Sequence, residues 1–361
     1  MKVLFDHQIF TSQQFGGVSK YFAEVIHRLP PESWKISAWL SNNEYARHYG
    51  LFKMTPFLPG RNFRGKGRIM AELGKPYSLK IMRRGDFDVV HQTNFDPYLF
   101  KATKGKPVVT TYHDTNFVTE YNYNPRMIRL QTESLRRSDA IIAISENTRR
   151  DMLKYFDLNP DKITVIHHGI EMPRIPAGLE ARIVEEPYIL YVGMRHLFKN
   201  FKNFVKGFGA IADKFPDVKV VCTRNPFNKE EQELFAQLGI TDRMQVVTAD
   251  EVTLNRLYRD ALFFVFPSLY EGFGMPILEA MANGCPTAIA EASCFPEIGG
   301  DASQYFNPKD TDSIADTLQT MIQDESLRRE LTRKGLRRAS KFSWQRCAEQ
   351  HMELYKSLTN I

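Results

Sequence analysis

Two glutamates, Glu271 and Glu279, lie where their carboxylates could bind the hydroxyl groups of a ligand. They belong to the stretch FPSLYEGFGMPILEAMANG, residues 266–284, which begins at the end of the apolar run LFFVF. The pattern predicts a buried strand, a glycine-containing loop and then a helix, because Pro276 suits the first turn of a helix. The free N–H groups and positive dipole end of such a helix could bind phosphate or polar sugar groups. The glutamates would then hold vicinal hydroxyls, those of a ribose or of a sugar ring.

Short apolar runs alternate with helical patterns along the chain, and these elements must position the candidate residues. In the first half the expected strands are Val3–Asp6, Lys35–Leu40, Asp88–Gln92, Pro107–Tyr112, Ala140–Ser145 and Ile163–His167, and the expected helices are Gly17–Leu29, Asn124–Arg137 and Glu146–Phe156. In the second half the expected strands are Tyr188–Val192, Lys219–Thr223, Met244–Thr248, Leu262–Pro267 and Thr287–Ala290, and the expected helices are Asn200–Lys214, Lys229–Leu238, Val252–Asp260, Pro276–Asn283, Asp312–Asp324 and Ser326–Lys341. Strands that are apolar throughout are typical of parallel sheets covered by helices. Two cycles of this alternation predict an α/β protein with two doubly wound domains.

The length of 361 residues also favours two domains, because a single core seldom grows this large. The proline-containing segment Glu171–Glu186 is the expected linker. We expect an N-terminal domain over residues 1–172, a C-terminal domain over 173–342, and a terminal helix over 343–361 that packs back on the N-terminal domain. Since ligands of doubly wound sheets bind beyond the carboxyl ends of the strands, two facing domains would form a deep cleft lined by the loops after the strands.

The composition is that of an ordinary globular protein, with 43% hydrophobic and 25% charged residues. No run of about 18 apolar residues predicts a membrane-spanning helix. The N-terminal MKVLFDHQIF is interpreted as a first buried strand and not as a signal peptide. The four cysteines lack zinc-ligand spacing, and we expect them to be reduced thiols of a cytoplasmic protein. They are Cys222, Cys285, Cys294 and Cys347.

Positive charge is concentrated in the first half of the chain. Residues 1–175 contain 26 Lys and Arg against 17 Asp and Glu, whereas the remaining residues contain 22 against 25. Within residues 53–84, nine basic residues stand against the single acid Glu72, with aromatic residues between them. This composition suits an anionic membrane surface or a lipid-phosphate acceptor, although a solvated loop and helix face would have the same composition. No nucleic-acid-binding motif accompanies the charge, so we expect no nucleic-acid partner.

The spacing of Glu271 and Glu279 resembles the E-x7-E motif of the retaining glycosyltransferases of family GT4, which have the GT-B fold of two facing Rossmann-like domains. Further segments are similar to that family and extend the resemblance from Met1 to about Asp310. They are GGVSK at 16–20, HD at 113–114, VIHHGI at 165–170, YVGMRHLFKN at 191–200 and PEIGGDA at 296–302. The resemblance implies a nucleotide-diphosphate sugar bound by the second domain and an acceptor bound by the first, with no separate cofactor.

The resemblance also implies roles for individual residues of the second half. Arg195 and Lys199 would neutralise the donor diphosphate, because fixed cations favour the charge that grows on it as the glycosidic bond breaks. With these two cations present, no divalent metal is expected. Glu279 would bind the ribose hydroxyls, and Glu271 would face the transferred sugar. The backbone N–H groups that could contact sugar or phosphate are those of Phe273, Gly274 and Met275.

In the first half, the resemblance points to a glycine pair and a histidine. Gly16 and Gly17 would let the backbone approach the diphosphate closely. His113 would bond the donor sugar or the acceptor hydroxyl. The other residues of this kind are interpreted as packing or interdomain residues, namely His91, His167, His168 and Asp114, although Asp114 could orient His113. Since no nucleophile is obvious, retention of configuration suggests front-face attack, in which the leaving phosphate helps to deprotonate the acceptor.

Several alternatives remain open from the sequence. Asp86-Phe-Asp88 resembles a metal-binding D-x-D motif, but it precedes a strand and so lies at the wrong end of the sheet for a ligand. A GT-B epimerase or phosphorylase would share the sheets but should lack the E-x7-E loop. A dinucleotide-dependent oxidoreductase needs a G-x-G-x-x-G after the first strand, which is missing here. A non-catalytic nucleotide-sugar-binding subunit would bind the donor without turnover.

The donor base and the acceptor are the least determined features. The opening DHQIF followed by GGVSKYF resembles bacterial surface-polysaccharide mannosyltransferases and favours GDP-mannose over a UDP-sugar as the donor. The basic N-terminal half suggests a glycan or lipid-linked oligosaccharide acceptor. We therefore expect a cytoplasmic protein with peripheral contact to the inner face of the plasma membrane through residues 53–84.

Overall fold

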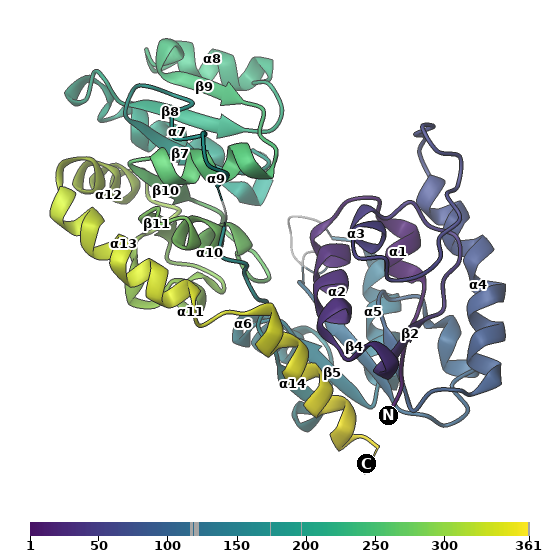
Figure 1. The fold of residues 1–361 in the computed structure, drawn as a ribbon. Coiled ribbons are helices and arrows are strands. Elements are labelled where there is room, and N and C mark those ends of the chain that lie inside the picture. Colours follow the sequence, from purple (N-terminus) through teal and green to yellow (C-terminus); the bar gives the residue numbers. More distant parts are fainter. Residues whose placement is uncertain (116–117, 119–122, 174, 196, 360–361) are drawn as a thin grey trace. The chain divides into compact units, whose positions relative to one another are not determined.

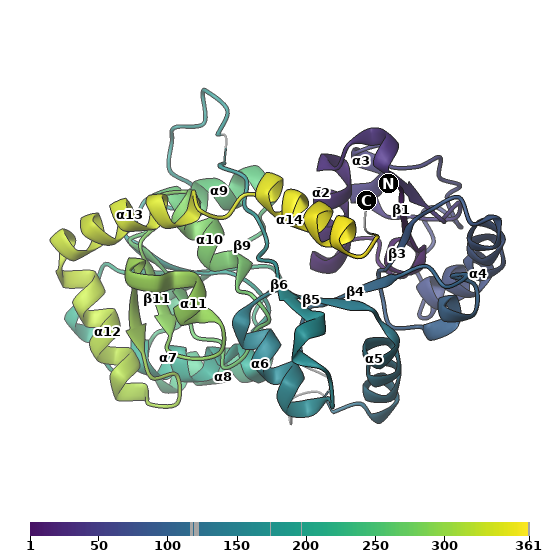
Figure 2. The same cartoon turned by 90° about the horizontal axis from the view of Figure 1, so that it is seen from below.

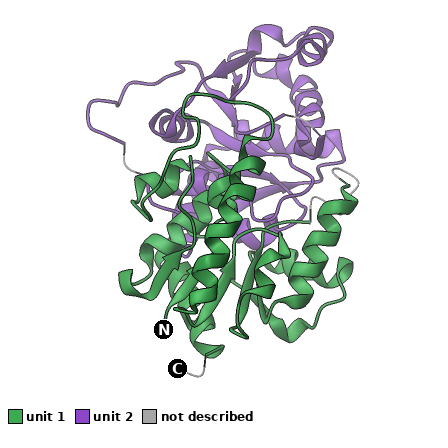
Figure 3. Ribbon diagram, turned by 90° about the vertical axis from the view of Figure 1, so that its right-hand side faces the viewer, with its two compact units in different colours: residues 1–169, 344–361 green, residues 170–343 purple. Residues whose placement is uncertain are grey.

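The computed structural model describes residues 1–115, 118, 123–173, 175–195 and 197–359. It divides into two compact units, which Figure 3 colours separately. Unit 1 comprises Met1–Gly169 together with Trp344–Ile361, and unit 2 comprises Ile170–Ser343. The chain therefore passes from unit 1 to unit 2 and returns to unit 1 with its last helix.

Unit 1 is built on a six-stranded parallel sheet with the strand order β2-β1-β3-β4-β5-β6 (Figure 1). Its strands are β1 (Val3–Phe5), β2 (Trp34–Ile36), β3 (Val89–Gln92), β4 (Val108–Tyr112), β5 (Ala140–Ala143) and β6 (Ile163–Val165). All six strands expected in the first half occur, with ends that differ by a few residues. Every residue of β1, β3, β4 and β5 is buried, as in parallel sheets covered on both faces.

The helices of unit 1 come from both ends of the chain. They are α1 (Gln8–Ser12), α2 (Gly17–Arg28), α3 (Glu44–His48), α4 (Lys66–Arg84), α5 (Pro125–Arg137), α6 (Glu146–Tyr155) and the C-terminal α14 (Trp344–Ser357). Helix α14 packs against α2, beside which it lies in Figure 2. The last helix of the chain is therefore part of the core of the N-terminal unit.

The 19-residue helix α4 was not among the helices expected from the sequence. Gly74 and Pro76 lie inside it, and both residue types disfavour a helix interior. A β-carbon at position 74 would lie 2.6 Å from the ring of His7. The glycine therefore allows α4 to pack closely against the loop after β1. This tertiary contact offsets the low helix propensity of glycine.

Unit 2 is built on a second parallel sheet with the order β12-β11-β10-β7-β8-β9. Its strands are β7 (Tyr188–Tyr191), β8 (Lys219–Thr223), β9 (Met244–Val247), β10 (Phe263–Phe266), β11 (Thr287–Ala290) and β12 (Ser303–Phe306). Its helices are α7 (Phe201–Gly209), α8 (Lys229–Gln237), α9 (Glu251–Asp260), α10 (Met275–Ala282), α11 (Phe295–Gly299), α12 (Thr311–Gln323) and α13 (Glu325–Ala339). Strand β12 and helix α11 were not expected, because the half-buried edge strand SQYF has no apolar run and α11 is only five residues long.

In each sheet the direction in which strands are added reverses once. The reversal falls between β1 and β3 in unit 1 and between β7 and β10 in unit 2. The loops that leave the carboxyl ends of two such strands diverge, and ligands of doubly wound proteins bind in the crevice between them. The topology therefore points to the loops after β7 and β10, and to those after β1 and β3.

Candidate functional site

The loops after β7 and β10 are tied together at the reversal point of unit 2. The ammonium group of Lys199 forms an ion pair with the carboxylate of Glu271, and the two side chains are 21% and 18% exposed. The backbone N–H of Leu269 donates a hydrogen bond to the carbonyl oxygen of Phe198 over 2.7 Å, which fixes the two loops to each other. A partly exposed cation and a carboxylate thus lie together where the topology predicts a ligand.

The loop after β11 holds the backbone of Glu271. The hydroxyl of Ser293 donates to the carbonyl oxygen of Glu271 over 2.7 Å, and the N–H of Glu271 donates back to that hydroxyl over 3.2 Å. One serine therefore satisfies both backbone polar groups of Glu271. The carboxylate is consequently presented from a backbone that is fixed on two sides.

Helix α10 begins at this loop, as the sequence predicts. Its first flanking residue is Gly274, whose φ of +87° is a left-handed conformation that other residues rarely adopt. A β-carbon at this position would also lie 3.1 Å from a side-chain carbon of Ile277 and 3.4 Å from the ring of Phe295. Phe273 is buried, while Met275 is partly exposed at the first turn. The left-handed conformation of this glycine therefore determines the direction in which α10, with the N–H groups of its first turn, leaves the loop.

Glu279 lies one turn inside α10 and is partly exposed. The hydroxyl of the buried Tyr258, on α9, donates a hydrogen bond to the Glu279 carboxylate over 3.3 Å. Burial, together with the neighbouring Glu279 carboxylate, raises the pKa of Tyr258 well above its usual value, so the hydroxyl stays protonated. Tyr258 can therefore orient the Glu279 carboxylate toward a ligand.

Arg195 and Lys199 share the loop after β7 but have different partners. The guanidinium of Arg195 forms an ion pair with Glu231 of α8 at 2.9 Å, and its side chain is 7% exposed. It also donates to backbone carbonyls of the loop after β8. Each of the two cations is therefore paired with a carboxylate, Arg195 with Glu231 and Lys199 with Glu271, and Lys199 is the more exposed of the two.

The candidate residues of unit 1 lie in different surroundings. The Nε2 atom of His113, directly after β4, is buried and has no hydrogen-bond partner within the described part of the chain. Burial, with a smaller effect of His351, lowers the pKa of His113 to about 3, so the ring is neutral.

Gly16 precedes α2 and packs against the side chain of Gln13, while the space beside Gly17 is open. The short helix α1, which was not predicted from the sequence, lies between β1 and this glycine pair.

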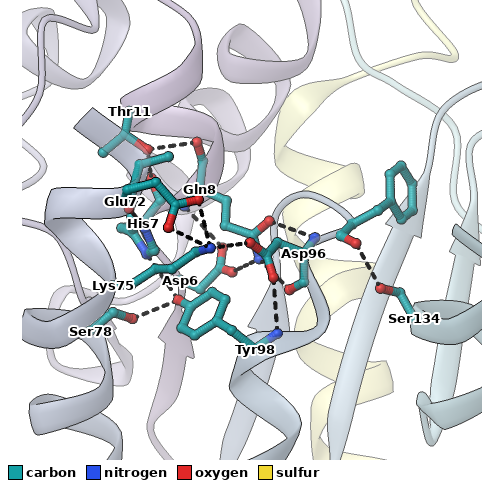
Figure 4. A network of polar contacts seen from close by, with 12 residues as sticks. Asp6, His7, Gln8, Thr11, Glu72, Lys75, Ser78, Asp96, Tyr98 and Ser134 are labelled. Atoms are coloured by element: carbon teal, nitrogen blue, oxygen red, sulfur yellow. Dashed lines mark hydrogen bonds and ion pairs between the residues drawn. The ribbon is translucent and has the colours of Figure 1, made fainter. Parts of the chain in front are cut away.

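A polar network that the sequence interpretation missed occupies the reversal point of unit 1 (Figure 4). The buried carboxylate of Asp6, after β1, accepts hydrogen bonds from Gln8 and from the backbone and hydroxyl of Thr93, after β3. Burial raises the pKa of Asp6 to about 6, and these hydrogen bonds oppose that shift. Lys75 of α4 pairs with Asp96 at 2.6 Å. The residues DHQ directly after the first apolar run were the available signal for this network.

The C-terminal helix α14 contributes His351 to a second buried network. The Nδ1–H of His351 donates to the carbonyl oxygen of Cys347 over 2.7 Å, because a carbonyl can only accept. Its Nε2 must then accept, so the hydroxyl of Tyr21 donates to it over 2.7 Å. The ring of Tyr21 in turn packs edge-on against His113, with centroids 5.0 Å apart. The last helix is therefore linked through Tyr21 to the surroundings of His113.

Four other expectations concern the D-x-D segment, metal binding, membrane-spanning helices and the cysteines. Asp88 accepts the backbone N–H of Lys2 over 2.7 Å, and Asp86 pairs with the Lys2 ammonium at 3.1 Å, so the D-x-D segment is part of the approach to β3. Within the described ranges, no group of three or more His, Cys, Asp or Glu residues is arranged to hold a metal ion. In that same part of the chain, no helix is both long and apolar enough to cross a membrane. The four cysteines are free and buried.

Comparisons with known proteins agree with this arrangement. Residues 15–174 match the family described as Glycosyltransferase Family 4, and residues 180–338 match Glycosyl transferases group 1. The chain is 30% identical to O-antigen chain mannosyltransferase B of Escherichia coli over 281 residues, which cover 73% of each protein. It is 27% identical to the serotype-specific mannosyltransferase WbdA of the same organism over 62% of this chain, but it spans only 29% of WbdA.

A solved structure shows the same fold. The crystal structure of HepE from Anabaena, in complex with UDP and glucose, matches 99% of this chain and 100% of its own length with a TM-score of 0.77. The sequences are 15% identical, so this likeness concerns the fold. The expected GT-B architecture, with two Rossmann-like domains, is confirmed by the two parallel sheets and by this neighbour.

Proposed function

The chain belongs to glycosyltransferase family 4, and from this premise we propose that it is a retaining, metal-independent hexosyltransferase with a nucleotide-diphosphate sugar as donor. The observation that carries the proposal is the Lys199–Glu271 pair at the reversal point of unit 2, beside the first turn of α10. It combines a cation for a diphosphate, a carboxylate for sugar hydroxyls and a helix N-terminus at the edge of the sheet where doubly wound proteins bind ligands.

We assign the donor contacts as follows. Lys199 neutralises the diphosphate, and a fixed cation there favours the transition state because negative charge grows on the leaving group. Glu279, oriented by Tyr258, binds the ribose hydroxyls. Glu271 accepts hydrogen bonds from the transferred sugar, so that donor binding replaces part of its ion pair with Lys199. The N–H groups at the start of α10 that complete the site are those of Phe273, Gly274 and Met275.

Retention is proposed to proceed by attack on the face that the leaving group occupies. The bond between the anomeric carbon and the diphosphate oxygen breaks, the acceptor oxygen bonds to that carbon, and the acceptor proton passes to a diphosphate oxygen. In this scheme Glu271 accepts hydrogen bonds from the transferred sugar and does not act as a nucleophile. Trapping a covalent sugar adduct on Glu271 would overturn this mechanism.

From unit 1 we propose contacts by His113 and by the backbone at Gly16 and Gly17. Because burial keeps His113 neutral, its ring can donate a hydrogen bond through one nitrogen and accept one through the other. Its Nε2, which has no hydrogen-bond partner among the described residues, is the atom proposed to bond a donor-sugar or acceptor hydroxyl. The open space beside Gly17 permits close approach of a phosphate to the backbone.

The proposed donor is GDP-mannose, and the proposed pathway is cell-surface polysaccharide synthesis. The support is the name of the relative that is 30% identical, an O-antigen chain mannosyltransferase. A UDP-sugar is the alternative donor, since the structural neighbour HepE was crystallised with UDP. The contacts proposed above involve the diphosphate and the sugars. No residue is assigned to the nucleotide base, whose identity the following experiment determines.

Calorimetric titration with GDP, UDP and ADP in the presence of EDTA tests the donor site. We expect one nucleotide to bind to the wild type, and Glu279→Gln to weaken it about tenfold, as loss of a charge-assisted hydrogen bond does. Glu230→Gln, an exposed glutamate on α8, serves as the matched control. NMR of the product made from the matching nucleotide sugar should show the anomeric configuration of the donor. Absence of binding by all three nucleotides, or an inverted product, would refute the proposal.

We also propose that helix α4 brings the enzyme to an anionic membrane surface that carries the acceptor. Ile69 and Leu73 are 44% and 50% exposed, and Tyr77 continues this stripe with a spacing of four residues on one helix face. Basic side chains flank the stripe, an arrangement typical of helices that lie in the interface of a bilayer. Three exposed arginines lie just before or in the first turn of α4, namely Arg61, Arg64 and Arg68.

Vesicle co-sedimentation tests this surface. Replacing Arg61, Arg64 and Arg68 with glutamine should reduce binding to phosphatidylglycerol vesicles by about tenfold or more, since each basic residue near such a surface contributes roughly 1 kcal/mol. Lys66 is left unchanged because its ammonium group donates to the carbonyl oxygens of Leu58 and Arg61. Replacing three exposed arginines of α5 is the matched control, namely Arg126, Arg129 and Arg136. Equal loss in both variants would reject α4 as the membrane surface.

A further inference from the structure

Arg195 is bound on three sides by the loop and helix that follow β8. Its Nε atom donates to Glu231 over 2.9 Å, and its Nη1 atom donates to the carbonyl oxygen of Thr223 over 3.3 Å. Its Nη2 atom donates to the carbonyl oxygens of Asn225 and Pro226 over 2.7 and 2.9 Å, and to Glu231 over 3.3 Å. All three guanidinium nitrogens therefore have acceptors within unit 2.

The same guanidinium is enclosed by aromatic rings and by the start of a helix. It lies 4.9 Å from the ring centroid of Phe227 and 5.7 Å from that of Phe201. Its partner Glu231 also accepts the backbone N–H of Asn228 over 2.9 Å in the capping box that begins α8. Arg195, the loop after β8 and the first turn of α8 thus form one connected polar cluster.

The loop that Arg195 holds has a strained backbone. Arg224 has a φ of +75°, a left-handed conformation that non-glycine residues seldom adopt. The two carbonyl groups that flank it, those of Thr223 and Asn225, both accept from Arg195. Strained residues persist where the surroundings determine the conformation, and they concentrate at ligand sites. Arg195 therefore fixes the direction in which the exposed Arg224 leaves the carboxyl end of β8.

We infer that Arg195 is a positioning residue for the loop of residues 224–228 and does not bind the donor diphosphate. This inference rests on the proposed function and assigns the diphosphate contact at the loop after β7 to Lys199. The contacts support it, because all three guanidinium nitrogens of Arg195 have acceptors and its side chain is 7% exposed. Lys199, which is paired with Glu271, is 21% exposed and faces the loop after β10. Strand β8 is the neighbour of β7, so the shape of the loop after β8 is proposed to affect the whole bound nucleotide and not the terminal phosphate alone.

The decisive measurement compares GMP and GDP binding by calorimetry in five variants. If Arg195 positions the loop, Arg195→Gln and Glu231→Gln should each weaken both nucleotides by a similar factor, and the double variant should be no worse than either single one. Arg195→Lys should not restore binding, because lysine cannot make the forked contacts of a guanidinium. Lys199→Gln should instead weaken GDP about tenfold more than GMP.

A contact between Arg195 and the diphosphate would give a different pattern. Arg195→Gln would then weaken GDP alone, and Glu231→Gln would leave GDP binding unchanged or strengthen it by releasing the guanidinium. Either result would overturn the inference.

If the wild type binds no nucleotide, the proposed function fails, and the inference is decided by amide hydrogen exchange in the intact protein. Arg195→Gln and Glu231→Gln should then accelerate exchange selectively in residues 223–231. Exchange that matches the wild type in that segment would refute the positioning role, independently of any ligand.

Discussion

Acidification from pH 7 to pH 5 should destabilise unit 1 through His351 of α14. This imidazole is enclosed in the interior, where its Nδ1–H donates to the Cys347 carbonyl and its Nε2 accepts from the Tyr21 hydroxyl. The nearby titratable ring of His91, stacked at 6.0 Å, is also neutral because burial lowers its pKa. Protonation of His351 would turn Nε2 into a donor facing a hydroxyl that already donates, in surroundings that do not solvate the charge.

The magnitude follows from the two pKa values of His351. Burial lowers the folded pKa to about 4, whereas an unfolded histidine has a pKa near 6.5. The folded state therefore binds fewer protons between these values, and stability must fall as the pH falls through this window. For a single group the linkage relation gives a loss of about 2 kcal/mol between pH 7 and pH 5. This is a large share of the total stability of about 5–15 kcal/mol that is typical of folded proteins.

Tryptophan fluorescence during urea unfolding is a selective assay for unit 1. All three tryptophans of the chain lie in this unit, namely Trp34, Trp39 and Trp344. The wild type should lose stability from pH 7 to pH 5. His351→Gln retains an acceptor for Tyr21 and a donor for Cys347, and it should lose about 2 kcal/mol less than the wild type over the same interval.

The outcome is decided by the difference between the two pH dependences and not by the stability at one pH. His351→Gln will itself destabilise unit 1 by about 1–3 kcal/mol if its hydrogen bonds are imperfect. Equal pH dependence in the wild type and the variant would refute the argument, because it would mean that His351 titrates alike in the folded and unfolded states.

Three further predictions concern unit 2. Gly274→Ala should destabilise unit 2 by about 1–2 kcal/mol, since its φ of +87° is costly for any residue with a β-carbon, and far-UV circular dichroism in urea that shows no loss would contradict this. Tyr258→Phe removes the hydrogen bond to Glu279 and should weaken nucleotide binding about two- to tenfold with kcat little changed; unchanged affinity in calorimetry would exclude an orienting role. Lys199→Gln should lower kcat about 100-fold, whereas the exposed Lys202→Gln should retain activity, and similar rates for the two variants would argue against leaving-group stabilisation.

Apart from β12, the strands and the E-x7-E loop were predictable because their signals are local. Buried parallel strands are continuous apolar runs, and the loop of Glu271 combines glycines, a helix-starting proline and two carboxylates within twenty residues. Helix α4 was not predictable in the same way. Gly74 and Pro76 are helix-breaking by local rules, and only the close approach of His7 explains why a glycine occupies that position.

The ion-pair partner of each charged side chain could not be predicted from neighbouring residues in the sequence either. The sequence places Arg195 and Lys199 four residues apart in one loop, which suggests a common ligand. In the fold, β7 lies between β8 and β10, so the two side chains reach toward different neighbours. Asp6 and Thr93 are likewise 87 residues apart in the chain and meet only because β1 and β3 are adjacent strands.

By itself the sequence determined the class of fold, the family and the segment that holds Glu271 and Glu279, because these depend on periodicity and on motifs within a few residues. The tertiary structure alone decided which cation faces Glu271, which histidines are neutral and which helix completes unit 1. The physical reason is that ion pairing and pKa depend on burial and on distances of a few ångströms, which strand order sets between residues that are remote in the chain.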